Sequence, residues 1–192
     1  MGKIKTLSLF TGAGGFDLGL DKRFEIIGFS EIDPHAIAIY NYKFPGIRNY
    51  GDITKIKISE LPDFDLLIGG SPCTSFSIAG KRDGFLGQSG LFYYYLDVLK
   101  TKQPSTFIWE NVKGTLSSTD GWDFANIIVG LDEAGYSIRW EVLNSKDFGV
   151  PQDRERIFLV GYLRGCERPE LLFNPHISED LEAEKQGIRF LF

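Results

Sequence analysis

Apolar residues along the chain fall into short continuous runs and into longer segments with helical spacing. The short runs, bounded by glycines and polar turns, predict β-strands at residues 6–10, 25–30, 66–68, 107–109, 137–143 and 157–162. Apolar positions at three- and four-residue intervals predict helices that begin at residue 34 and span residues 92–99 and 121–134, with a shorter helical segment at 17–20. Strands that alternate with helices are typical of an α/β fold with an open sheet.

Residue types suited to chemistry follow the predicted strands at their carboxyl ends. A glycine-rich turn at residues 11–16 follows the first strand, Glu31 the second, Cys73 the third and Glu110 the fourth. Open α/β sheets bind ligands beyond the carboxyl ends of their strands. Glycines let a ligand approach the backbone closely, and a carboxylate after the second strand suits the two hydroxyls of a ribose. The opening strand, turn and helix therefore predict a nucleotide-binding crossover unit.

Each of these side chains also has an ordinary structural interpretation. Free cysteine often does no more than pack, so Cys73 on its own supports packing as well as catalysis. Asp52, in a small turn, suits either a cap or a contact with the exocyclic amine of adenine. Glu110 suits a solvent-exposed strand end. Arg154 and Arg156 suit the solvated start of a strand, although their spacing also makes both point the same way in an extended backbone.

The segment after Cys73 is rich in glycine. Residues 74–90 include glycines at positions 80, 84, 87 and 90. Glycine accepts the backbone changes that closure of a loop demands. We therefore predict that this segment is a lid over a substrate bound at Cys73, which would act as a nucleophile.

Composition and charge narrow the class of protein. A length of 192 residues with 43% apolar and 24% charged residues fits one globular domain with a sizeable core. The formal net charge of −5 argues against a surface that binds nucleic acid throughout, so such contacts would be local or completed by another polypeptide. Two cysteines, no signal-peptide pattern and no membrane-length apolar run predict a protein of the reducing cytoplasm, without a membrane partner.

Four motifs, in this order, resemble those of the cytosine-5 DNA methyltransferases of the bacterial restriction-modification type. They are FTGAGG at residues 10–15, GGSPC at 69–73 followed by Phe76-Ser77, ENV at 110–112 and QDRER at 152–156. The resemblance covers nearly all of residues 7–162. Each motif alone is weak, but four in sequence, each at the expected end of a strand, are highly specific. The combination favours the functional interpretations of Cys73, Glu110 and Arg156.

The resemblance implies a fold and a methyl donor. The fold is that of the S-adenosylmethionine-dependent methyltransferases: a doubly wound, mostly parallel sheet with an antiparallel strand near the C-terminal end. S-adenosylmethionine is the implied cofactor, and no metal is implied. The residues expected to bind the cofactor are Phe10, Gly12, Gly14, Glu31, Ile32, Asp52, Ile53, Pro72 and Leu91.

The resemblance also implies a covalent mechanism on a base turned out of double-stranded DNA. The Cys73 thiolate would add to carbon 6 of cytosine and make carbon 5 nucleophilic. Glu110 would engage nitrogen 3 and the exocyclic amine, and Arg156, with Arg154 behind it, would bind the oxygen at carbon 2. The lid residues expected to contact DNA phosphates are Ser77, Lys81 and Arg82.

The chain departs from the family pattern after the arginine motif. We expect residues 1–165 to form the catalytic and cofactor-binding domain and residues 166–192 a C-terminal tail or partner-docking segment. A target-recognition domain and the family's Asn-containing returning helix are not recognisable. Two explanations remain open: a catalytic subunit completed by a second polypeptide, or a truncated or interrupted gene product.

Three other functions remain as alternatives. A tRNA cytosine methyltransferase shares the catalytic core, although the lid sequence at residues 74–77 is more similar to the DNA type. An inactive cofactor-binding or regulatory partner would use the donor site alone. A nicotinamide-dependent dehydrogenase shares the opening crossover, but it offers no joint role for Cys73, Glu110 and Arg156.

Overall fold

The computed structural model describes residues 2–72 and 90–166 of the chain. Cys73, three lid residues expected to contact DNA (Ser77, Lys81 and Arg82) and the tail from residue 167 lie outside the described residues.

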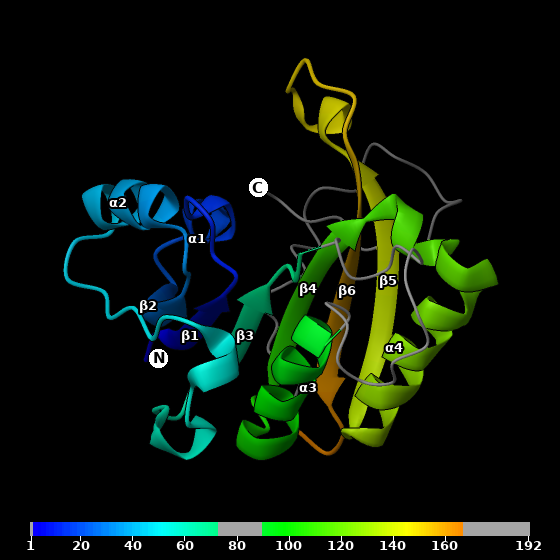
Figure 1. Ribbon diagram of the computed structural model, residues 1–192, viewed down its shortest axis with the longest axis horizontal. Coiled ribbons are helices and arrows are strands. Elements are labelled where there is room, and N and C mark those ends of the chain that lie inside the picture. The colour runs from blue at the N-terminus through cyan, green and yellow to red at the C-terminus, as the bar shows by residue number, and fades with distance from the viewer. Residues whose placement is uncertain (1, 73–89, 167–192) are drawn as a thin grey trace.

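One mixed sheet organises the described residues (Figure 1). Its strands are β1 (Ile4–Leu9), β2 (Phe24–Ser30), β3 (Leu66–Gly69), β4 (Thr106–Val112), β5 (Tyr136–Asn144) and β6 (Glu155–Leu163). They lie in the order β2-β1-β3-β4-β6-β5. The pairs among β2, β1, β3 and β4 are parallel, whereas β6 runs antiparallel to both β4 and β5. The predicted mostly parallel sheet with an antiparallel strand near its C-terminal end is confirmed, and the segment at 137–143 is an edge strand.

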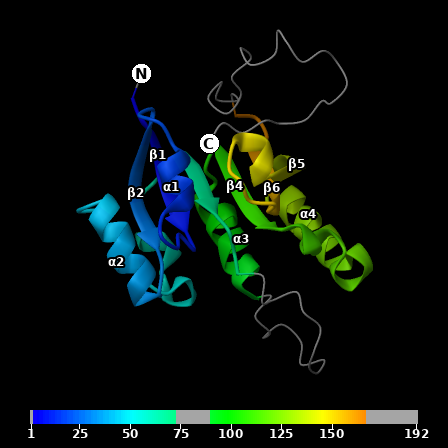
Figure 2. The ribbon, with the colours of Figure 1, turned by 90° about the horizontal axis from the view of Figure 1, so that it is seen from above.

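Helices cover the two faces of the sheet unequally. They are α1 (Gly15–Gly19), α2 (Pro34–Lys43), α3 (Gly90–Lys102) and α4 (Trp122–Glu133). Helix α3 lies beside β3 and β4, and α4 lies beside β5 (Figures 1 and 2). Their buried side chains join the larger hydrophobic cluster, whereas Phe16 of α1 packs against the smaller cluster around Ile68 and Val160. Within the described residues, no helix is both long and apolar enough to cross a membrane.

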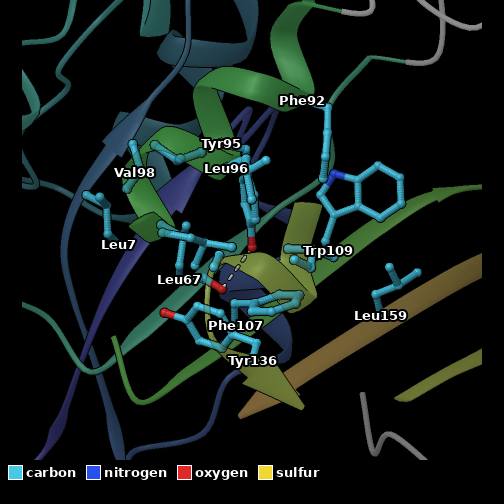
Figure 3. Close-up of a cluster of buried hydrophobic side chains, with 14 of the residues drawn as sticks. Leu7, Leu67, Phe92, Tyr95, Leu96, Val98, Phe107, Trp109, Tyr136 and Leu159 are labelled. Atoms are coloured by element: carbon cyan, nitrogen blue, oxygen red, sulfur yellow. Dashed lines mark hydrogen bonds between the residues drawn. The ribbon is translucent and has the colours of Figure 1, made fainter. Parts of the chain in front are cut away.

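The predicted buried face of α3 is confirmed. Phe92, Tyr95, Leu96 and Leu99 are all buried, as their spacing requires for one face of a helix. The Tyr95 hydroxyl donates to carbonyl oxygens of β3 and β4. It lies 3.3 Å from the oxygen of Leu67 (Figure 3) and 3.0 Å from that of Ile108. This buried hydroxyl therefore has acceptors on two neighbouring strands, and it fixes the helix across their junction.

A glycine on β6 makes room for the core. Gly161 lies opposite Phe107 of β4, and a Cβ at that position would overlap the phenyl ring. We expect Gly161→Ala to lower the free energy of unfolding by about 1–3 kcal/mol, because extra atoms in a packed core force the neighbours out of place. Gly90→Ala is the matched control, since a Cβ there meets nothing within 4 Å. Equal urea midpoints for the two variants would contradict this packing.

Candidate active site at the carboxyl edge of the sheet

The register of the parallel strands brings the ends of β1, β2 and β3 level with one another and with Trp109 of β4. Leu9 at the end of β1 pairs with Ser30 at the end of β2 and with Gly69 at the end of β3. Gly69 in turn pairs with Trp109 of β4. The chain moves from β1 outward to β2, and from β3 outward to β4, so the direction of winding reverses between β1 and β3. Such a switch point is where open α/β sheets bind ligands.

The next residue on each strand belongs to a single row along this edge. The row contains Phe10, Glu31, Gly70 and Glu110, in the strand order β1, β2, β3 and β4. Phe10, Glu31 and Glu110 were predicted as site residues. Gly70 precedes the Ser71-Pro72 dipeptide that leads to Cys73. The sheet thus places residues from distant parts of the sequence side by side at the predicted functional edge.

The glycine-rich loop after β1 has an unusual backbone. Phe10, Gly12 and Gly14 all have positive φ angles, of 53°, 57° and 89°. A phenylalanine rarely adopts this conformation, and such residues gather at functional turns. A Cβ at Gly12 would meet nothing within 4 Å, so open space lies against the loop at that point. The loop can therefore admit a ligand close to its backbone.

Glu31 connects the glycine-rich loop to the end of β2. Its Oε2 accepts a 2.7 Å hydrogen bond from the backbone N–H of Gly12, and its Oε1 accepts from the N–H groups of Ile32 and Asp33 at 2.8 and 2.9 Å. The Ile32 side chain beside it is 69% exposed. Together they present a fixed carboxylate and an apolar surface, which suit the ribose and the base of a nucleoside.

Asp52 is a helix cap in this structure. Its Oδ1 accepts hydrogen bonds from the backbone N–H and the hydroxyl of Thr54, at 3.0 and 2.8 Å, at the start of the 3-10 helix Ile53–Lys55. These bonds, led by that of the Thr54 hydroxyl, lower the pKa of Asp52. The Ile53 side chain is buried in the core, so any contact of Ile53 with a cofactor would come from its backbone. The cap interpretation of Asp52 is confirmed, and the adenine contact stays a prediction.

Glu110 and Arg156 form an ion pair on neighbouring antiparallel strands. The Arg156 Nε lies 2.9 Å from Glu110 Oε1, and each side chain is 23% exposed. Burial raises the pKa of Glu110, while the positive charges of Arg156 and Arg154 oppose that rise. A carboxyl balanced in this way can hold or release a proton. The structure therefore brings together the two members of the predicted triad that lie in its described part.

Arg154 lies just before β6 begins and is exposed. Asn144, at the end of β5, anchors its backbone: Oδ1 accepts from the Arg154 N–H at 3.2 Å, while Nδ2 donates to Asp153 at 2.5 Å. Asn144 could not be identified from the sequence, because its partners lie nine and ten residues further along the chain. A turn-favouring asparagine at a strand end was the only available signal.

Two side chains that flank Glu110 hold the segment leading to Cys73. Trp109 Nε1 donates to the Ser71 hydroxyl at 3.2 Å, and Asn111 Nδ2 donates to the Ser71 carbonyl oxygen at 3.1 Å. Ser71, Trp109 and Asn111 are all buried. Residues 109 and 111 point to the same face of a strand, opposite to residue 110. Strand alternation could have grouped these two side chains, but not shown that Ser71 is their partner.

The two other residues predicted to bind the cofactor have different environments. Pro72 is exposed at the end of the described segment, and Leu91, in the first turn of α3, packs partly against the core. The described residues bring together no cluster of three metal-ligating side chains.

Close packing at Gly70 sets the position of the Glu110 side chain. A Cβ on Gly70 would lie 2.6 Å from Glu110 Oε2 and 3.1 Å from the Glu110 carbonyl oxygen. We expect Gly70→Ala to displace the carboxylate from Arg156 and to lower the activity of the site by up to about a hundredfold, the factor that a misplacement of about 1 Å can cost. Gly114→Ala is the control, since its nearest neighbour would be 3.9 Å away. A Gly70→Ala enzyme with unchanged turnover would contradict this tight fit.

The chain is similar to a known family of proteins. A family profile described as C-5 cytosine-specific DNA methylase matches residues 4–189. The orphan methyltransferase M.SPRI of Bacillus phage SPR is 44% identical over 192 residues, which cover 96% of this chain and 42% of the relative. The type II methyltransferase M.NgoBV of Neisseria gonorrhoeae is 40% identical over 197 residues, which cover 95% of this chain and 46% of the relative.

Solved structures share the fold. The Dnmt2 methyltransferase of S. pombe has a TM-score of 0.72 at 24% identity, over 86% of this chain and 53% of that chain. A putative DNA modification methyltransferase encoded within a prophage of E. coli has a TM-score of 0.73 at 24% identity, over 91% and 51% of the two chains. The chain thus spans about half the length of these structures and less than half of the two relatives above.

Proposed function

Since the chain belongs to the C-5 cytosine-specific DNA methylase family, we propose that it is the catalytic portion of an enzyme that methylates carbon 5 of cytosine in DNA. The observation that carries the proposal is the Glu110–Arg156 ion pair, packed against Gly70 at the start of the segment that leads to Cys73. A carboxyl, a guanidinium and the described residues that lead to Cys73 thereby converge at the same edge of the sheet as the glycine-rich loop.

The methyl donor S-adenosylmethionine fits the row of residues at the ends of β1 and β2. Open space against Gly12 accommodates a ligand at the loop, Glu31 offers its carboxylate to the ribose hydroxyls, and the exposed Ile32 offers an apolar surface to the adenine. Phe10, Gly14, Asp52, Ile53, Pro72 and Leu91 complete the proposed site. The bound donor supplies an electrophilic methyl group on a sulfonium.

Residues of β4, of the segment after β3 and of the start of β6 act on the cytosine. The Cys73 thiolate adds to carbon 6, which makes carbon 5 nucleophilic. Glu110 holds a proton at nitrogen 3 and accepts from the exocyclic amine, a role that its burial supports because burial raises the pKa of the carboxyl. Arg156, supported by Arg154, binds the oxygen at carbon 2, where negative charge develops. Once carbon 5 carries the methyl group, a base removes the carbon 5 proton, the ring double bond re-forms and Cys73 leaves as the thiolate.

Target recognition is proposed to come from outside these residues. The relatives are longer, since the matched regions cover 42% and 46% of M.SPRI and M.NgoBV. A recognition half, on the same or on a second polypeptide, would supply most of the contacts with DNA bases. Ser77, Lys81 and Arg82 of the proposed lid would add contacts to phosphates, which are not base-specific.

Transfer of a labelled methyl group tests the proposed function. The chain, supplied with a recognition half, is incubated with labelled S-adenosylmethionine and either duplex DNA or tRNA. We expect label at carbon 5 of cytosine in the DNA. Label in tRNA alone would instead support a tRNA methyltransferase. Donor binding without transfer to either substrate would support a regulatory partner.

A further inference from the structure

We propose that Asp17 is a positioning residue that holds the cofactor loop in its binding conformation through a buried chain of hydroxyl groups. The inference rests on the proposed function, because it assigns the loop at residues 10–15 to S-adenosylmethionine. Asp17 lies in α1, directly after that loop, and only 3% of it is exposed. It takes no part in the chemistry described above.

Three hydroxyl groups converge on the Asp17 carboxylate, directly or in series. Tyr40 of α2 donates to Oδ1 at 2.9 Å, and Ser8 of β1 donates to Oδ2 at 3.0 Å. Thr11, within the loop, lies with its hydroxyl 3.1 Å from the Ser8 hydroxyl and 3.2 Å from the Ser8 carbonyl oxygen. All four residues are buried, so each bond is shielded from water.

The hydrogen bonds have one direction. The Ser8 hydroxyl has a single proton, which it gives to the carboxylate, so Thr11 must act as the donor toward Ser8. Tyr40 gives its proton to the other carboxylate oxygen. The chain of donors therefore ends at Asp17, and an apolar side chain at position 17 would leave buried donors without their acceptor.

The same network restrains the loop from two sides. The Thr11 carbonyl oxygen accepts from the Gly14 N–H at 3.0 Å, which closes the turn. The Tyr40 ring limits Gly14 directly, since a Cβ there would lie 3.0 Å from it. The Tyr40 ring itself packs against the rings of Phe29 and Phe44, with centroids 4.0 and 4.8 Å away. Asp17 thus joins β1, the loop and α2 at one point.

Burial of the Asp17 carboxyl group in the core costs free energy of folding. Burial raises the pKa of Asp17, and the hydrogen bonds from Tyr40 and Ser8 only oppose that rise. Well-packed apolar residues are often at least as stable as buried charged groups. A role in orienting the loop accounts for a charge that packing alone does not require.

The test compares two tyrosines on the same helix. Tyr40→Phe removes the hydroxyl that donates to Asp17 and keeps the ring, whereas Tyr42→Phe removes a hydroxyl from a residue that is 88% exposed. S-adenosylmethionine binding to the full chain is measured by calorimetry, and unfolding is measured by urea. We expect the dissociation constant of Tyr40→Phe to rise about tenfold, because fewer molecules hold the competent loop. Tyr42→Phe should bind as the wild type does.

Further variants separate positioning from folding. Asp17→Asn should stay within about threefold of the wild-type affinity, because an amide can accept from Tyr40 and donate to Ser8, whereas Asp17→Ala should not. If Tyr40→Phe does not fold, Thr11→Val removes the outermost hydroxyl and should weaken binding likewise. A lower urea midpoint with an unchanged dissociation constant, in Tyr40→Phe or in Thr11→Val, would overturn the inference. Absence of binding by the wild type would instead overturn the proposed function.

Discussion

Replacing Cys73 with alanine should abolish methyl transfer and leave the affinity for S-adenosylmethionine unchanged. Carbon 5 of cytosine is a poor nucleophile until a thiolate has added to carbon 6, and neither Glu110 nor Arg156 can replace that covalent step. The donor site proposed at the ends of β1 and β2 uses other side chains, so its affinity should not depend on the thiol. Radiolabel transfer and calorimetry on the same preparation measure both quantities.

Cys166→Ala is the matched control for this prediction. Cys166 is exposed and lies beyond the end of β6, away from the row at the carboxyl edge. We expect that variant to transfer methyl groups at the wild-type rate. Turnover by Cys73→Ala would disprove the covalent mechanism, and loss of donor binding in Cys73→Ala would show that the thiol belongs to the donor site.

Replacing Glu31 with alanine should weaken the binding of S-adenosylmethionine by about a hundredfold or more. The substitution removes the acceptor for the Gly12, Ile32 and Asp33 N–H groups as well as the proposed partner of the ribose hydroxyls. Hydrogen bonds to charged groups each contribute about 1.5–3 kcal/mol, and about 1.4 kcal/mol corresponds to a factor of ten. Calorimetry with the full chain measures the change.

Two further variants give this measurement its controls. Glu25→Ala removes an exposed carboxylate from the same strand and should leave binding unchanged. Glu31→Gln keeps an acceptor oxygen but loses the charge, so it should fall between the wild type and Glu31→Ala. Wild-type affinity in Glu31→Ala would show that the donor does not bind at the end of β2.

The sequence was informative about this site wherever a functional side chain directly follows a strand. Parallel strands carry their carboxyl ends to one edge, so Glu31 and Glu110 could be grouped before any coordinates were known. The register confirms that grouping, because Leu9 pairs with both Ser30 and Gly69, and Gly69 pairs with Trp109. The four motifs, taken in their order, then favoured a catalytic over a purely structural role for Cys73, Glu110 and Arg156.

The contacts that hold the site could not be predicted in the same way. Tyr40 is 23 residues from Asp17, and Asn111 is 40 residues from Ser71. Such pairs depend on how the helices and strand ends pack, which periodicity does not encode. The interpretation of Asp52 as a cap, by contrast, needed only the neighbouring Thr54 and was available from local sequence.

The most direct test of the account is covalent trapping on duplex DNA that contains 5-fluorocytosine. The fluorine at carbon 5 cannot leave as a proton does, so an adduct formed by the cysteine would accumulate. The chain, with a recognition half and S-adenosylmethionine, should give a protein–DNA adduct that mass spectrometry assigns to the Cys73 peptide, and Cys73→Ala should give none. Methylation of ordinary cytosine DNA without such an adduct, or an adduct on another residue, would contradict the proposed mechanism.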